Sequence, residues 1–225
     1  MNKFIDKFID LFKWPVAFYI LLSTPAILSS FRIFMVADIN NLSLFAGLIF
    51  FIFSKTMMDP SVRTSMQVIA HEFTHSFFAV LTFHKINHIR INPDDTGGEM
   101  GFMGKGNWLI IIGPYFFPLF CFIYICLMYF LPSGFIFHFI LGYFLGYHID
   151  TVFSQIHPEQ TDLKKVGYFF CFIFLPGINC LTTGLILSFN LKGFQGITDY
   201  FLLINQINLS YVSEILKFIT HLQLF

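Results

Sequence analysis

Residues 68–78 read VIAHEFTHSFF, an HExxH pattern inside an apolar stretch. In an α-helix, residues four apart differ in direction by only about 40°, so the imidazoles of His71 and His75 point to one place above the same face. Glu72 projects beside them. The pattern therefore predicts two nitrogen ligands for a metal ion, together with a carboxylate that can act as a general base.

Zinc suits this set of side chains. Catalytic zinc sites use three protein ligands and leave the fourth position to a water molecule, whose pKa falls to about 7. Glu72 would accept the proton of that water as it attacks a carbonyl carbon. Ionisable side chains are costly inside a membrane-spanning segment, so three of them within one helical turn favour a functional site over a chance match.

The composition is that of a polytopic membrane protein. Of the 225 residues, 56% are hydrophobic and 12% are charged, whereas soluble domains average about 25% charged residues. The formal net charge is zero, so no nucleic-acid partner is predicted. The four cysteines show no CxxC spacing, which favours neither a disulfide framework nor a thiolate zinc site. We expect one membrane-embedded domain over residues 1–225.

Six apolar stretches predict an all-α bundle of about six transmembrane helices. They are residues 16–36, 42–53, 62–83, 108–131, 135–149 and 166–189. The third stretch carries HEFTH. The fourth is interrupted by Gly113, Pro114 and Pro118, so we expect a broken helix that faces the metal site. In the fifth, Gly142 and Gly146 are spaced for close helix contact.

Amphipathic segments flank these spans. Residues 1–14 and residues 200–225 place apolar side chains at helical spacing opposite polar ones. Each segment is predicted to be a helix that lies in the membrane interface or packs on the domain.

The segment after the motif, residues 84–107, is polar and rich in glycine. Two short strands about a turn at residues 92–98 are predicted, and such a hairpin would offer an open edge to an extended peptide. A structural loop is the alternative interpretation. His84 and His88 are also four apart, but no acid stands close to them in sequence, so we interpret them as ordinary interface histidines.

Two histidines on one helix need a third ligand from elsewhere. The candidates near later span ends are Asp150, Asp162, His148, His157 and Glu159. A carboxylate is favoured because two histidines and one carboxylate leave a coordination position open.

Four features follow one another along the chain: HEFTH in an apolar helix, a glycine-rich segment, Gly113-Pro114 in the next span and an aspartate near a later one. Together they resemble the site-2 protease family of intramembrane metalloproteases, peptidase family M50, and in particular its short M50B-like bacterial members. The resemblance covers residues 60–190, the expected catalytic core.

The resemblance implies that His71, His75 and an aspartate bind Zn²⁺ and that Glu72 is the base. The family's usual Asp-Gly pair, which follows an Asn-x-x-Pro element, is absent from this chain. The sequence QTDL at residues 160–163 looks most like the equivalent in the short members. This likeness favours Asp162 over Asp150 as the third metal ligand.

The function implied is a zinc-dependent endopeptidase of regulated intramembrane proteolysis. Its partners would be the lipid bilayer and a membrane-spanning or membrane-anchored protein substrate, and its location the bacterial inner (plasma) membrane. One alternative is a non-proteolytic binding or regulatory protein that keeps the fold, which the missing Asp-Gly pair favours. Another is a metal transporter that uses His71, Glu72 and His75 as a transit site.

Overall fold

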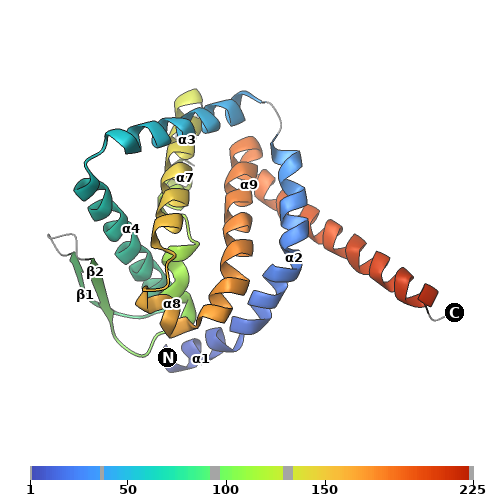
Figure 1. Cartoon of the computed structure of the whole chain (residues 1–225), viewed down its shortest axis with the longest axis horizontal. Coiled ribbons are helices and arrows are strands. Elements are labelled where there is room, and N and C mark those ends of the chain that lie inside the picture. Colours follow the sequence, from blue (N-terminus) through green and yellow to red (C-terminus); the bar gives the residue numbers. More distant parts are fainter. Residues whose placement is uncertain (1, 36–37, 92–96, 129–133, 223–225) are drawn as a thin grey trace.

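The computed structural model describes residues 2–35, 38–91, 97–128 and 134–222, and helices make up most of them (Figure 1). The helices and strands in chain order are α1 (Asn2–Leu11), α2 (Lys13–Phe34), α3 (Ile39–Met57), α4 (Pro60–Leu81), β1 (Ile86–Ile91), β2 (Gly98–Phe102), α5 (Trp108–Ile112), the 3₁₀ turn η1 (Gly113–Tyr115), α6 (Leu119–Met128), α7 (Phe135–Gln155), α8 (Thr161–Val166) and α9 (Tyr168–Leu222). The predicted all-α polytopic bundle with a short hairpin is confirmed.

The number of spans differs from the expected six. Within the described ranges, four helical segments are long and apolar enough to cross a membrane. They are Lys3–Arg32, Ile39–Met57, Phe135–Gln155 and Tyr168–His221. The pair Trp108–Tyr115 and Leu119–Leu127, bent by 86° at the predicted break, would add a fifth. Helix α4 does not qualify, because Arg63, Glu72 and many hydroxyl and imidazole groups lower its hydropathy.

Close helix contacts hold the bundle together. Helix α3 packs against α7, and α2 packs against α9 (Figure 1). A Cβ atom at Gly142 would lie 1.8 Å from the Leu44 carbonyl oxygen, and one at Gly47 would lie 1.8 Å from that of Phe139. These two glycines therefore let the backbones of α3 and α7 touch, as small residues do in membrane helix pairs.

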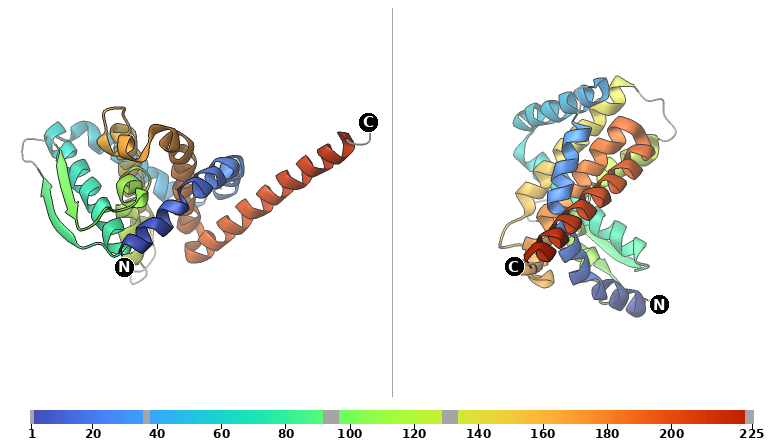
Figure 2. Two further views of the ribbon diagram at one scale, coloured as in Figure 1. Left: turned by 90° about the horizontal axis from the view of Figure 1, so that it is seen from below. Right: turned by 90° about the vertical axis from the view of Figure 1, so that its right-hand side faces the viewer.

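Helix α9 changes direction at Lys192 and Gly193, whose backbone angles are not helical. Its second arm returns along α2, where Asn208 Nδ2 donates a hydrogen bond to Ser23 Oγ at 2.9 Å. The arm then extends beyond the bundle toward the C-terminus (Figure 2). The predicted C-terminal helix is thus present up to Leu222. Residues 223–225 of that prediction lie outside the described residues.

Helix α1 contacts the domain through its polar face. Asp6 is buried and accepts hydrogen bonds from His84 Nε2 at 3.2 Å and from Asn107 Nδ2 at 2.9 Å. The opposite face, with Phe4 and Leu11, is exposed. His84 is therefore a buried anchor for α1 and not the interface histidine that was predicted, because its acidic partner comes from the distant N-terminal helix.

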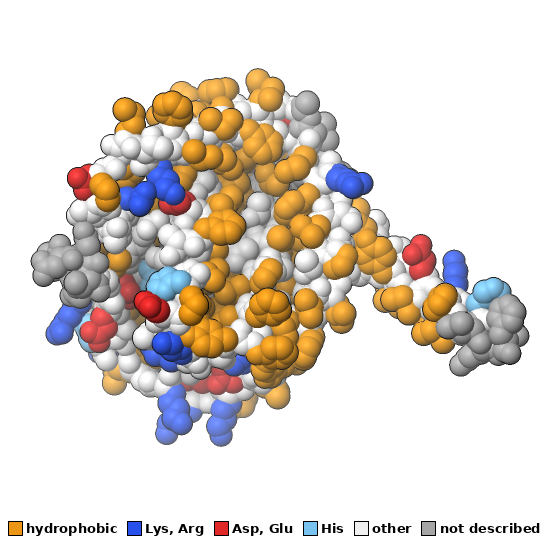
Figure 3. Space-filling view, in the orientation of Figure 1, with side chains coloured by type: hydrophobic (Ala, Val, Ile, Leu, Met, Phe, Trp, Pro, Cys, Tyr) orange, Lys and Arg blue, Asp and Glu red, His pale blue; other side chains and the backbone are white. Residues whose placement is uncertain are grey.

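The exposed surface of the long helices is apolar. Phe18 and Leu22 on α2, and Phe169 and Phe172 on α9, are exposed large hydrophobic side chains. On the face seen in Figure 3, hydrophobic groups cover α2, α7 and α9, while charged groups gather toward the left and lower margins. This distribution is expected of helices that face hydrocarbon with polar groups toward its boundary.

Candidate metal centre

The HEFTH helix forms one wall of a pocket of about 460 Å³. Strand β2 forms a second wall, and helix α5, the end of α7 and helix α8 complete the lining. The predicted strands are present, with Ile86–Ile91 paired antiparallel to Gly98–Phe102. Residues 92–96 of the predicted turn lie outside the described residues. The polar segment after the motif helix is therefore a hairpin that borders the pocket, and not a plain loop.

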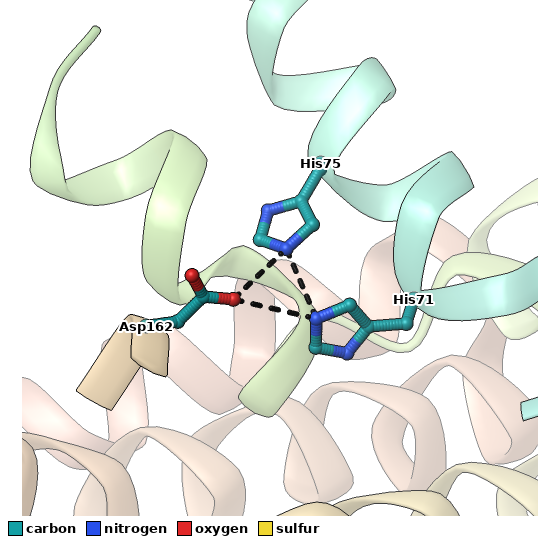
Figure 4. Close-up of side chains that lie close together, drawn as sticks. All are labelled: His71, His75 and Asp162. Carbon is teal, nitrogen blue, oxygen red and sulfur yellow. Dashed lines mark hydrogen bonds and ion pairs between the residues drawn. The ribbon is translucent and has the colours of Figure 1, made fainter. Parts of the chain in front are cut away.

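His71, His75 and Asp162 meet in this pocket (Figure 4). The two Nε2 atoms are 3.0 Å apart, and the Asp162 Oδ2 atom lies 3.5 Å from that of His71 and 3.2 Å from that of His75. Ligands at bond lengths of about 2.0–2.1 Å and tetrahedral angles are separated by about 3.3 Å. The three atoms thus have the mutual spacing of three ligands around one zinc ion.

Hydrogen bonds on the far side of each ring determine which nitrogen faces the pocket. His75 Nδ1 donates to the Ile110 carbonyl oxygen at 2.7 Å. His71 Nδ1 donates to Gln155 Oε1 at 2.8 Å. Because a neutral imidazole carries one hydrogen, each Nε2 atom then presents a lone pair.

The pocket therefore contains three acceptor atoms that point at one another: two imidazole nitrogens and a carboxylate oxygen. Acceptors held at this distance repel each other unless a proton or a cation lies between them. The donor set also matches what zinc binds in proteins, namely imidazole nitrogen and carboxylate oxygen. The residues present fit a zinc ion.

Asp162 reaches this position from the first turn of the short helix α8. Its second carboxylate oxygen, Oδ1, accepts a hydrogen bond from Lys165 Nζ at 3.2 Å. Lys165 thus engages one oxygen and leaves the other directed at the two histidines.

Glu72 lies beside the histidines on α4 and lines the same pocket, with only 6% of its surface exposed. Strand β2 passes close to it, because a Cβ atom at Gly98 would lie 2.7 Å from Glu72 Cγ. Glycine at this position lets the strand approach the carboxylate.

The other candidate ligands lie elsewhere. Asp150 pairs with Lys55 and accepts a hydrogen bond from Gln67 Nε2 at 3.2 Å. His157 and Glu159 are exposed, and His148 is buried between α7 and α9. Among the described residues, the only histidine, cysteine and acidic side chains grouped closely enough to hold a metal ion are His71, His75 and Asp162.

Two supporting groups were not foreseen from the sequence. Gln155 stands at the end of α7, distant in sequence from the motif, and a backbone carbonyl such as that of Ile110 has no sequence signal at all. The helix break was predicted to face the site, and its η1 turn does pack against α4. There Asn179 Nδ2 donates to the Tyr115 carbonyl oxygen at 2.9 Å, so a neighbouring helix satisfies a carbonyl group of the break.

A comparison with protein families agrees with this arrangement. The family model described as Peptidase M50B-like matches residues 42–149. Residues 42–149 are therefore similar to this peptidase family. The matched segment contains HEFTH, the hairpin and the broken span, and Asp162 follows it. No curated protein and no solved structure matches the chain. The apolar helices are those of a multi-pass membrane protein, and the matched segment is similar to a metalloprotease family.

Proposed function

We propose that this chain is a member of the M50 peptidase family and a zinc-dependent intramembrane endopeptidase that cleaves membrane-spanning or membrane-anchored proteins. We further propose that it acts in regulated intramembrane proteolysis in a bacterial inner membrane. The observation that carries the proposal is the convergence of His71 Nε2, His75 Nε2 and Asp162 Oδ2, three acceptors without a shared hydrogen, beside the buried Glu72.

His71, His75 and Asp162 would hold the metal ion. Zinc bound there would polarise the scissile carbonyl and supply an activated water molecule. The Glu72 carboxylate would accept the proton of that water and return it to the leaving amine. Glu72 suits this task because it lines the pocket with the ligands and is not itself one of the converging groups.

Strand β2 offers a way to hold the substrate. In the described part of the chain the sheet has two strands, so one edge of β2 is unpaired, and Gly98, Glu99 and Met100 line the pocket. A substrate that adds to this edge is held by main-chain hydrogen bonds in an extended form. A helical membrane segment would have to unwind first, so the proposed substrates carry helix-breaking residues near the cleaved bond.

The test compares wild type with Glu72→Gln in detergent, using a panel of synthetic membrane-spanning peptides with and without a central Gly-Pro pair. Glu72→Gln keeps the side chain's size and removes the base, so cleavage should fall at least about 100-fold while zinc content stays unchanged. Equal cleavage by the two proteins would assign the activity to a contaminant and refute the proposal. A zinc-bound wild type that cleaves none of the peptides would favour the non-proteolytic binding protein.

A further inference from the structure

The Gln155 side chain bridges two groups of the motif helix. Its Oε1 atom accepts the hydrogen bond from His71 Nδ1 at 2.8 Å, and its Nε2 atom donates to the Gln67 carbonyl oxygen at 3.3 Å. Because Nε2 has an acceptor in front of it, the amide can present only its oxygen to His71. The orientation of the amide thus fixes the hydrogen of His71 on Nδ1 and leaves Nε2 free for the pocket.

The hydrogen bonds continue away from the pocket. The Gln67 side chain donates to Asp150 Oδ2 at 3.2 Å, and the other oxygen of Asp150 pairs with Lys55 Nζ. Gln67 is buried, and only 16% of the Asp150 side chain is exposed. Lys55 belongs to α3, Gln67 to α4, and Asp150 and Gln155 to α7. One series of polar contacts therefore connects three helices behind His71.

The two histidines differ in how they are held. His75 is held by a main-chain carbonyl group, which side-chain substitution cannot remove. His71 is held by a side chain whose own position depends on further side chains. Partners of this kind orient a metal-binding imidazole and raise its basicity, and their loss weakens metal binding by about 10–100-fold.

We infer that Gln155 is a positioning residue for the metal centre, and that Lys55, Asp150 and Gln67 hold α4 and α7 in the register that lets Gln155 reach His71. The inference rests on the proposed zinc site. It also gives Asp150, the alternative candidate for third ligand, a role of its own: it supports His71 through other residues without facing the metal.

The first measurement is the zinc dissociation constant of the full chain in detergent, obtained by competition with a chelator. We expect Gln155→Leu to weaken zinc binding by about 10–100-fold, because the ring of His71 loses its acceptor. Gln155→Glu keeps an acceptor in place and should stay within about threefold of wild type. Gln195→Leu makes the same chemical change on α9, where the side chain contacts Asp199, and should leave the affinity unchanged.

A second measurement separates positioning from folding. The visible spectrum of the cobalt-loaded protein reports the ligand geometry, so Gln155→Leu should change it at saturating cobalt. The metal-free variant should still unfold in one cooperative transition, with its midpoint lowered only by the loss of the two Gln155 hydrogen bonds. Should Gln155→Leu fail to fold, Gln155→Met and Asp150→Asn replace it, with expected losses of affinity of about tenfold and about threefold.

The outcomes distinguish the two proposals. A folded wild type that holds no zinc would refute the proposed function, and this inference with it. If wild type binds zinc and every folded variant keeps the wild-type zinc affinity and cobalt spectrum, the positioning role alone is refuted.

Discussion

Two of the polar clusters that contain histidine, the pocket and a cluster between α3, α7 and α9, differ in one respect. At the pocket, His71, His75 and Asp162 direct three acceptor atoms at one another. In a second cluster, His138 Nδ1 donates to Asn190 Oδ1 at 2.8 Å, and Asn190 Nδ2 donates to Asn41 Oδ1 at 2.9 Å. All three side chains of the second cluster are buried.

The difference lies in the balance of donors and acceptors. In the second cluster each of these two hydrogen bonds pairs a donor with an acceptor, so the cluster stabilises the packing of α3, α7 and α9 without any added group. In the first cluster the acceptors lack donors, so it is complete only with a cation or additional protons. Buried histidine alone therefore does not indicate a metal site; an excess of acceptors in a pocket does.

The largest expected effect comes from removing one histidine from each cluster. His75→Ala takes away one of three ligands, so zinc should fall from about one ion per chain to less than about a tenth. His138→Ala makes the same change in the second cluster and should keep about one zinc. Elemental analysis of the monodisperse proteins measures the zinc content of both variants. Loss of zinc from folded His138→Ala would show that the two clusters are not functionally distinct.

Asp162→Asn should give the first cluster a hydrogen-bond donor, so that its donors and acceptors can pair as those of the second cluster do. The new amide can donate to an imidazole Nε2 atom, so the metal-free variant should be at least as stable as the metal-free wild type. Zinc affinity should fall by at least about tenfold, because a neutral amide replaces a carboxylate ligand. Thermal unfolding measures the stability of the metal-free proteins, and chelator competition measures their zinc affinity. A metal-free Asp162→Asn protein that is markedly less stable than wild type would argue against unpaired acceptors in the native site.

Removing the metal should destabilise the wild type. A ligand present at a hundredfold excess over its Kd stabilises the folded state by about 2.7 kcal/mol, which corresponds to about 5–10 °C in Tm for a chain of this size. A chelator should therefore lower the midpoint of wild type by about that amount. His75→Ala is the control, and its midpoint should not respond to the chelator. An equal response in both proteins would place the stabilising ion elsewhere.

The smallest effect is expected in the second cluster. Asn190→Leu removes both of its hydrogen bonds within the bundle. Hydrogen bonds between membrane helices contribute about 0.6–2 kcal/mol each, so loss of the two bonds should lower the free energy of unfolding by about 1–4 kcal/mol. Zinc content should remain that of wild type, which elemental analysis of the same sample checks. A fall in zinc content would couple the two clusters and weaken the contrast between them.

The part of the site that lies on α4 could be predicted from the sequence. HExxH spacing and helical geometry together place His71, Glu72 and His75 close to one another on the surface of one helix. The hairpin could also be predicted, because two short segments with apolar residues at alternate positions flank a turn sequence. Asp162 was one of five candidates until the family resemblance favoured it, because spacing within α4 carries no information about which distant loop returns to the site.

Other features depend on tertiary structure. Gln155 meets His71 only because α7 ends beside α4. His84 is buried because Asp6 of α1 reaches it across the domain. All six predicted apolar stretches form helices in their described residues. The motif helix α4 is of spanning length, but its polar side chains serve the pocket and lower its hydropathy, so it does not meet the hydropathy criterion that four or five of the helical segments meet.

X-ray absorption at the zinc edge, recorded on folded wild type purified without chelators, tests the central claim most directly. We expect about one zinc per chain with only nitrogen and oxygen neighbours at about 2.0–2.2 Å, two of them from imidazoles. Folded protein without zinc, or a zinc–sulfur distance of about 2.3 Å that points to a cysteine ligand, would contradict it.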